Sequence, residues 1–200
     1  MNFRIENKYK IDVLKIDELY NYFKNNFAEV LYPRRKIRSV YFDNNILSSY
    51  EESIEGIVPW KKIRLRTYTD KKIFDLKNIF NLEVKINSVE GRLKKVTKDV
   101  DHIKLLNMGI LDPVYGLMIP VVEVNYIREY YSIHNLRITL DTKIDYNIFN
   151  KRKSTISNEE AILEIKSDNL NNFNYIDEKL NLMKTRYSKY SNAIENLQLA

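Results

Sequence analysis

The sequence predicts an α+β fold in which about eight antiparallel strands form a barrel or a strongly curved sheet, with helices packed outside it. One observation is that strand-length segments carry charged residues at every second position, as in Lys62-x-Arg64-x-Arg66. Because positions i and i+2 of a strand point to one face, such strands have one charged and one apolar face. The other observation is that most connections between these segments are short and contain turn residues, which indicates hairpins.

Eight segments have the length and the alternation that are typical of strands. They are residues 3–10, 36–42, 60–68, 81–87, 92–97, 120–131, 136–142 and 161–166. Glu90-Gly91 marks the turn of one hairpin, and residues 132–135 form the turn of the longest one. Pro33 is expected to break the chain before the second strand, because proline lacks the N–H that a paired strand donates.

Five segments are predicted to be helical, mainly because apolar residues recur every three to five positions. They are residues 13–27, 46–54, 99–108, 169–183 and 187–199. Asp12 is the expected N-cap of the first helix, since a short acidic side chain can accept from the free backbone N–H groups there. Gly56 and Gly109 are expected to end the second and third helices.

Composition limits the possible functions. The 200 residues suit one domain, spanning residues 1–200, and the net charge of +6 does not by itself indicate nucleic-acid binding. The absence of cysteine excludes disulfides and thiolate metal sites, and two histidines are too few for a zinc site. The four glycines form no phosphate-binding loop. No run of apolar residues is long enough to span a bilayer, and the first strand begins at residue 3. We therefore expect a cytoplasmic protein without a secretory signal.

The charged strand faces suggest a chemistry. A curved sheet with these faces inside would enclose a tunnel lined by cations and a few carboxylates, which suits a chain of phosphates with a divalent metal. Arg137-x-Thr139-x-Asp141 repeats the alternation with a hydroxyl in the middle. The simpler alternative is a water-facing sheet with ion pairs between strands. Glu6 and Glu83 fit that alternative best, as partners of neighbouring cations.

Eight motifs, in order along the chain, resemble the VTC domain, the polyphosphate polymerase domain of the eukaryotic vacuolar transporter chaperone and its bacterial relatives. They are RIENKY, RSVYFDN, KIRLRTY, LEVKI followed by EGRLKK, YIREYY, RITLD, LEIK and RYSKYSNAI. The resemblance runs from Arg4 to about Ile194. It implies a triphosphate tunnel metalloenzyme of the CYTH-like superfamily, with an eight-stranded antiparallel β tunnel, flanking helices and a C-terminal helix.

The resemblance also implies roles for individual residues. Residues matching the family's catalytic cations are Lys8, Arg64, Arg66, Lys85 and Lys189. Those matching substrate-binding positions are Arg128, Arg137, Lys166, Arg186 and Ser188, with Arg186 replacing a lysine. Glu164 matches the metal-holding glutamate. We expect Lys8, Arg64, Arg66, Lys85, Glu164 and Lys189 to line one cavity.

Arg128 is an odd number of residues from Glu123 and Asn125, so in a regular strand it would point to the opposite face. Either a bulge intervenes or Arg128 faces outward.

The function that the resemblance implies is transfer of the γ-phosphoryl group of ATP to a polyphosphate chain, with Mn²⁺ or Mg²⁺. The expected partners are therefore ATP or another triphosphate and polyphosphate, without nucleic acid and with a possible further protein or membrane partner. Two alternatives remain: a triphosphatase of the same fold, acting on inorganic or nucleoside triphosphates, and a polyphosphate-binding module without catalysis. Fold alone does not choose between them.

Overall fold

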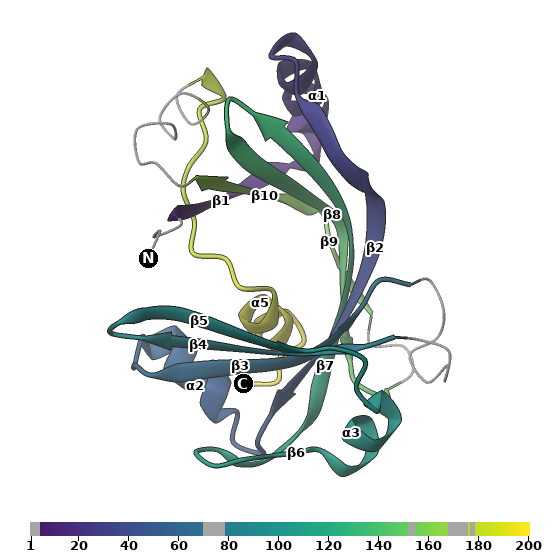
Figure 1. Cartoon of the computed structure of the whole chain (residues 1–200), viewed down its shortest axis with the longest axis vertical. Helices are drawn as coiled ribbons and strands as arrows, with labels where there is room; N and C mark the ends of the chain where they lie inside the picture. Colours follow the sequence, from purple (N-terminus) through teal and green to yellow (C-terminus); the bar gives the residue numbers. More distant parts are fainter. Residues whose placement is uncertain (1–4, 70–78, 152–154, 168–175, 177–178) are drawn as a thin grey trace. The chain divides into compact units, whose positions relative to one another are not determined.

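The structure is a computed structural model that describes residues 5–69, 79–151, 155–167, 176 and 179–200. Its strands form one sheet in the order β1-β10-β8-β7-β2-β3-β4-β5, with β6 paired to β7 and β9 to β8 (Figure 1). The strands are β1 (Ile5–Asp12), β2 (Glu29–Asp43), β3 (Trp60–Thr67), β4 (Asn81–Ser88), β5 (Gly91–Thr97), β6 (Ile110–Asp112), β7 (Gly116–Ile133), β8 (Leu136–Ile148), β9 (Ile156–Asn158) and β10 (Glu160–Ser167).

The helices within the described residues are α1 (Ile16–Asn25), α2 (Ser48–Glu55), α3 (His102–Met108) and α5 (Lys189–Asn196), and a 3₁₀ turn (Val13–Lys15) precedes α1. The Asp12 carboxylate accepts from the Leu14 N–H, so Asp12 caps the 3₁₀ turn, whereas α1 itself follows Lys15 and has no side-chain cap. Gly56 ends α2 with a left-handed φ of 76°, as predicted. Most of the predicted helix at 169–183 lies outside the described residues.

The α+β class and the eight predicted strands are confirmed, and the resolved registers of β1–β10, β10–β8, β2–β3, β3–β4 and β4–β5 are antiparallel. The strand order is open, with β1 and β5 at its two ends. β6 and β9 were not predicted, because three residues are too few to show alternation. The prediction for Pro33 was wrong: this residue lies within β2, in a half-strand whose residues are exposed and where a missing N–H is tolerated.

The chain divides into two compact units, and each takes three segments of the sequence. Unit 1 contains residues 1–35, 126–144 and 157–187, and unit 2 contains residues 36–125, 145–156 and 188–200. The strands β2, β7 and β8 run through both units. The expectation of a single domain is not tested by this division.

In unit 1, one face of β1, β8 and β10 packs against α1. Its buried apolar residues come from alternate strand positions, such as Leu163 and Ile165, and from the helix residues Leu19 and Phe23. The alternate positions that point away from this core carry the charged residues of the same strands. Packing of α1 therefore determines which face of the strands in unit 1 holds the ionisable groups.

In unit 2, the apolar face of β2, β3 and β4 packs against α3 and Met118. Val40, Phe42, Ile63 and Leu65 are almost completely buried in this core. The opposite face carries Ser39, Tyr41 and Asp43 from β2, and α5 covers part of it. The rings of Tyr41 and Tyr190 of α5 stack with their centroids 5.2 Å apart. Arg64, Arg66 and Glu83 of these strands are therefore buried, whereas Lys85 of β4 stays exposed.

A buried carboxylate fixes α5 on this face. Asp43 accepts hydrogen bonds from the Tyr190 hydroxyl at 2.6 Å and from the backbone N–H groups of Asn44, Ser49 and Tyr50. These bonds connect the end of β2, the first turn of α2 and the terminal helix. Burial raises the pKa of Asp43, although all four hydrogen bonds oppose that rise.

We expect Tyr190→Phe to lower the free energy of unfolding by about 1–3 kcal/mol, because it leaves one acceptor position of a buried carboxylate without its donor. Urea denaturation monitored by circular dichroism would measure the change. Tyr32→Phe is the matched control, since the Tyr32 side chain is 45% exposed and its hydroxyl can bond to water. Equal stability of Tyr190→Phe and Tyr32→Phe would contradict this account of how α5 is held.

Candidate functional site

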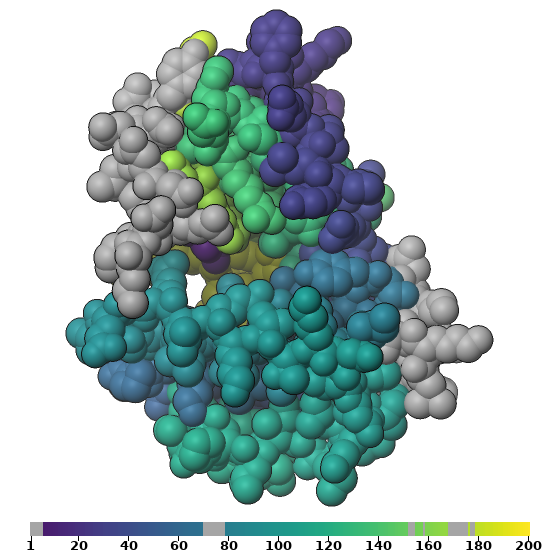
Figure 2. Space-filling model, viewed as in Figure 1, coloured from purple at the N-terminus to yellow at the C-terminus, as the bar shows by residue number. Residues whose placement is uncertain are grey.

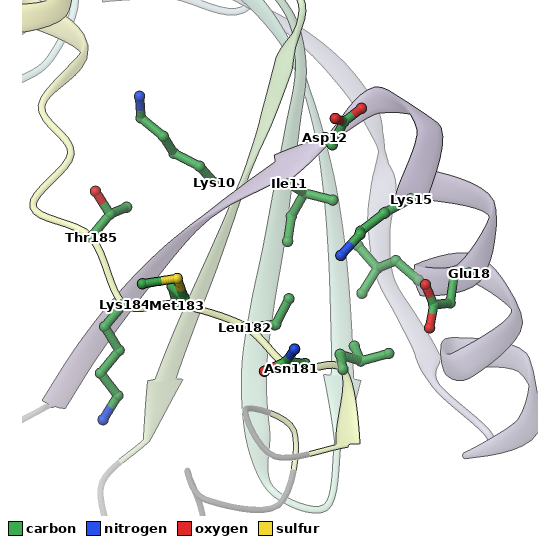
Figure 3. A pocket seen from close by; sticks show the side chains of 12 residues that line it. Lys10, Ile11, Asp12, Lys15, Glu18, Asn181, Leu182, Met183, Lys184 and Thr185 are labelled. Atoms are coloured by element: carbon green, nitrogen blue, oxygen red, sulfur yellow. The ribbon is translucent and has the colours of Figure 1, made fainter.

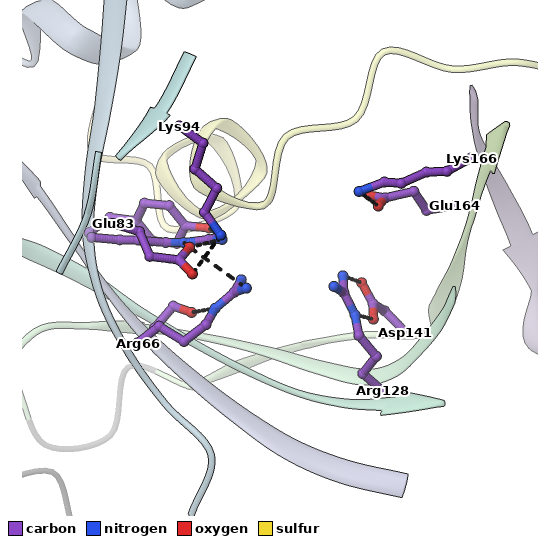
Figure 4. A network of polar contacts seen from close by, with 10 residues as sticks. Arg66, Glu83, Lys94, Arg128, Asp141, Glu164 and Lys166 are labelled. Carbon is purple, nitrogen blue, oxygen red and sulfur yellow. Dashed lines mark hydrogen bonds and ion pairs between the residues drawn. The ribbon is translucent and has the colours of Figure 1, made fainter. Parts of the chain in front are cut away.

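A basic cluster, which we define as Arg64, Arg66, Glu83 and Lys94, lies on the α5-covered face of unit 2 (Figure 4). Arg64 donates to Glu83 Oε2 through Nε at 2.8 Å and through Nη2 at 2.5 Å. Lys94 Nζ donates to Glu83 Oε1 at 2.8 Å, and Arg66 Nη1 lies 3.8 Å from Glu83 Oε2. One carboxylate thus contacts three cations, and these four side chains together carry two more positive than negative charges.

The strands determine how this cluster forms. Arg64 and Arg66 are two residues apart on β3, so both point to the same face, and Glu83 is the cross-strand partner of Arg64 on β4. Lys94 reaches Glu83 from β5, where it is paired with Lys85. Arg64, Arg66 and Glu83 are at most 9% exposed. The three buried side chains therefore hold their charges in an environment of low dielectric, where electrostatic interactions are strong.

Two pKa shifts report the excess of positive charge. Burial opposes ionisation of Glu83, but the charges of Arg64 and Arg66 outweigh it and lower its pKa far below the usual value. Burial likewise raises the pKa of the Tyr41 hydroxyl, yet Arg64, Arg66 and Lys189 lower it overall. A buried tyrosine with a lowered pKa indicates a strongly positive local potential. Such a potential favours binding of an anion.

Two groups also fix the orientation of the arginines. Arg64 Nη1 donates to the Tyr41 hydroxyl at 3.0 Å, and Arg66 Nε donates to Ser39 Oγ at 3.4 Å. A guanidinium that is held in advance loses less conformational entropy when it binds an oxyanion.

The start of α5 adds more cationic groups to unit 2. Ser188 is the N-cap of α5, because its Oγ accepts from the Ser191 N–H, and it also accepts from Lys62 Nζ at 2.7 Å. Lys189, the first residue of the helix, contributes to the positive potential at Tyr41. Lys85 lies on β4 with an exposed side chain. Ser188 therefore has a structural role as the cap of α5.

Unit 1 has a second set of charges, which we call the ionic network: Glu6, Lys8, Arg128, Asp141, Glu164 and Lys166. Lys166 Nζ contacts Glu164 Oε1 at 2.8 Å and Glu6 Oε2 at 3.4 Å, while Lys8 Nζ lies 3.3 Å from Glu6 Oε1. Arg128 binds both carboxylate oxygens of Asp141, at 2.5 and 2.7 Å (Figure 4). Three cations here face three carboxylates, so this network is balanced in charge.

Glu164 is ionised in this network. Burial opposes its charge, but Arg128, Lys166 and Lys8 together lower its pKa far below the usual value. Cross-strand pairing places it opposite Lys8 on β1 and opposite Thr139 on β8. An ionised, buried carboxylate that is paired with lysine can exchange that partner for a divalent cation.

The residues of the ionic network fit a hard metal ion in part. The Lys166 ammonium, which contacts Glu6 and Glu164, shows that these carboxylates can share one cation. Within the described residues, no group of three or more acidic, histidine or cysteine side chains is arranged to hold a metal. Two carboxylates are consistent with Mg²⁺ or Mn²⁺, because such ions keep several waters and take other oxygens from phosphates. They would not suffice for a site made of protein ligands alone.

The predicted residues fall into two sets. Arg64, Arg66, Lys85, Ser188 and Lys189 belong to unit 2, and Lys8, Arg128, Arg137, Glu164, Lys166 and Arg186 belong to unit 1. Their convergence on one cavity stays a prediction. Arg137 lies opposite Lys166 on β8 with its side chain exposed, and Arg186 is also exposed.

The contact with Asp141 shows to which face of its strand Arg128 points. Arg128 binds Asp141, which is on the same face of β8 as Thr139, the residue opposite Glu164. It therefore belongs to the charged face of unit 1. Glu123 and Asn125 lie an odd number of residues before Arg128 on β7, and they instead contact Arg38 of β2.

Sequence reasoning missed Lys94, Tyr41 and Asp141 as members of these sites. Lys94 follows the hairpin signal Glu90-Gly91, but its neighbour Lys95 and most of β5 are exposed, so the sequence alone does not single it out. The teal part of the chain, to which β5 belongs, lies at the surface in Figure 2. The alternation Arg137-x-Thr139-x-Asp141 did contain a signal for Asp141, since it places a carboxylate on the charged face.

A pocket of about 520 Å³ lies elsewhere in unit 1, between β1, α1 and residues 180–185 (Figure 3). Charged residues of both signs line it, among them Lys10, Asp12, Lys15 and Glu18. Lys10 also pairs with Glu160 at 3.0 Å. The pocket has no excess of buried cations comparable to that of the basic cluster, so we do not assign a phosphate to it.

Comparison with known proteins supports the fold and a family. The model of the VTC domain family matches residues 3–110 and 110–198. A structure titled a "putative adenylate cyclase", from Vibrio parahaemolyticus, is 16% identical over 99% of this chain and 98% of that one, with a TM-score of 0.54. A conserved hypothetical protein from Pyrococcus furiosus is 14% identical over 94% and 99%, with a TM-score of 0.56. These likenesses show a shared fold. No curated protein matches the chain.

No helix among the described residues has the length and the apolar character needed to cross a membrane.

We expect Glu83→Gln to lower the free energy of unfolding at pH 7 by about 3 kcal/mol or more, because it removes the only negative charge of the basic cluster and leaves buried cations. The lowered pKa of Glu83 also fixes the sign of the pH dependence. Its contribution to stability is complete above the unfolded pKa of about 4.3 and is lost as pH falls below it.

The stability difference between wild type and Glu83→Gln should therefore shrink on acidification from about pH 5 to pH 3. Denaturant titrations at several pH values would measure it, with the exposed Glu90→Gln as control. A difference that stays constant over this range would show that Glu83 is not held ionised by the arginines.

Proposed function

Because the chain belongs to the VTC-domain family, we propose that it is a polyphosphate polymerase that transfers the γ-phosphoryl group of ATP to a polyphosphate chain. The observation that carries the proposal is the basic cluster, in which three cations contact one buried carboxylate. A protein keeps excess buried positive charge at a cost in stability, and a polyanionic ligand offsets that cost.

Arg64 and Arg66 have the roles that phosphoryl transfer requires. The reaction demands little covalent work from the protein and depends on positioning and on neutralising the charge of the phosphates. Two guanidinium groups on one strand face can each donate two hydrogen bonds to non-bridging oxygens. Since Tyr41 and Ser39 already orient them, they bind the phosphates without first having to be ordered.

Lysines complete the proposed substrate contacts. Lys94 has a 45% exposed side chain beside Glu83, so it can turn from the carboxylate to a phosphate at little cost. In unit 2, Lys62 of β3, which contacts Ser188, adds charge along a longer anion together with Lys85 and Lys189. A polyphosphate needs many such contacts, because each phosphate unit carries about one negative charge.

Glu164 is the proposed metal ligand, and Mn²⁺ or Mg²⁺ the proposed cofactor. The bound ion would neutralise phosphate charge and thereby stabilise the charge that develops on the leaving oxygen. The positive charges of Arg128 and Lys8 help to keep Glu164 ionised. Lys166 shields it, and the ammonium can move to a phosphate oxygen when Glu164 binds the ion.

We propose a polymerase reaction in the cytoplasm, with ATP as the phosphoryl donor and Mn²⁺ or Mg²⁺ as the metal ion. The alternative within the same fold is a triphosphatase, in which water takes the place of the polyphosphate acceptor. A further alternative is a polyphosphate-binding module. The balanced ionic network argues against the last, because a pure anion-binding surface would gain nothing from three buried or partly buried carboxylates.

Incubation with ATP and Mn²⁺ separates these functions. A polymerase forms long polyphosphate, detectable by gel electrophoresis, together with ADP; a triphosphatase releases orthophosphate; a binding module forms neither product. We expect polyphosphate, and we expect excess chelator to abolish its formation. Release of orthophosphate as the only product would identify a hydrolase instead.

We expect Arg66→Lys to reduce turnover about tenfold or more while tripolyphosphate binding falls much less. Lysine keeps the charge but not the planar, bidentate donor, and a charge-assisted hydrogen bond contributes about 1.5–3 kcal/mol. The lost bond should affect the transition state more than the ground state. Steady-state kinetics and calorimetry would measure the two effects. Equal turnover of Arg66→Lys and wild type would leave Arg66 as a source of charge alone.

A further inference from the structure

Thr139, in the middle of β8, has a buried hydroxyl group without a partner. The residue is 5% exposed, and its Oγ1 makes no hydrogen bond in the structure. Leaving a buried hydroxyl unsatisfied destabilises the folded state, so such groups usually have a reason to be kept. Valine has almost the same shape and would avoid that cost.

The surroundings of Thr139 indicate that reason. It is the cross-strand partner of Glu164, and directly opposed residues of antiparallel strands point to the same face. Asp141, two residues along β8 on that face, is held by Arg128. The unused oxygen is therefore next to the carboxylate that we propose as the metal ligand, on a face that already carries the ionic network.

The chemistry of the pair suits a hard cation. Carboxylate and hydroxyl oxygens are both ligands that Mg²⁺ and Mn²⁺ accept, and such ions combine few protein oxygens with waters. A hydroxyl beside an anionic phosphate would work as well, but Thr139 lies opposite a carboxylate. We propose that Thr139 Oγ1 is an oxygen ligand of a divalent cation that Glu164 binds, an inference that rests on the proposed metal role of Glu164.

The test uses Thr139→Val and Thr139→Ser in the full chain. Mn²⁺ alone is the probe, and electron paramagnetic resonance of the free ion measures its binding without any reaction. Thr142→Val is the matched control. It makes the same change on the same strand, three residues away, where the side chain of a strand points to the other face. Thermal denaturation without metal checks that each variant folds.

We expect Thr139→Val to be at least as stable as wild type without metal, since it removes an unsatisfied buried hydroxyl. Its affinity for Mn²⁺ should fall about tenfold or more, the size typical of losing a group that supports a metal ligand. Thr139→Ser and Thr142→Val should bind Mn²⁺ as wild type does. A loss of stability without metal would instead mean that the hydroxyl has an internal structural role, and it would overturn the proposal.

The remaining outcomes separate this inference from the proposed function. If wild type and Thr139→Val bind Mn²⁺ equally while Glu164→Gln does not, Glu164 is a metal ligand and the inference about Thr139 fails. If wild type itself does not bind Mn²⁺, the metal role of Glu164 and the inference fail together. If Thr139→Val keeps its Mn²⁺ affinity but binds tripolyphosphate more weakly without metal, the hydroxyl contacts phosphate and the metal assignment is wrong.

Discussion

The ion pairs of Glu83 with Arg64, Arg66 and Lys94 are the interactions on which the charged face of unit 2 depends. Strands β2, β3 and β4 have a core on one face and α5 over part of the other, and Arg64, Arg66 and Glu83 are buried there. Desolvated arginines are costly without a counter-charge. Glu83 provides that charge. Its carboxylate offsets the repulsion between two guanidinium groups and an ammonium, so these three cations can lie close together.

The two units differ in how they balance charge, and the difference suggests a division of tasks. The basic cluster of unit 2 has three cations to one carboxylate, whereas the ionic network of unit 1 has three of each. The first arrangement favours an anion, and the second provides carboxylates that can exchange a lysine for a metal ion. A triphosphate is a polyanion and its divalent cation binds carboxylates, so each unit by itself agrees with one part of the proposed function.

The sequence predicted the features that depend on local periodicity. Alternation along β3 was sufficient to place Arg64 and Arg66 on one face. Gly56 was recognisable as the end of α2 and Asp12 as a cap, although Asp12 caps the 3₁₀ turn before α1, because capping is local. Pairing of Glu6 and Glu83 with neighbouring cations was predicted and is observed, but which residues of other strands would take part was not predictable. Lys94 reaches Glu83 only through the register of the β4–β5 hairpin, and Arg128 finds Asp141 across β7 and β8.

A crystal structure of the protein grown with tripolyphosphate and Mn²⁺ would test the central claim most directly, namely that the basic cluster is the phosphate-binding site. The account predicts phosphate oxygens within hydrogen-bond distance of the guanidinium groups of Arg64 and Arg66, with Lys94 turned from Glu83 toward the ligand. Tripolyphosphate bound instead in the pocket between β1 and α1 or on exposed lysines, with the Glu83 ion pairs unchanged, would contradict it.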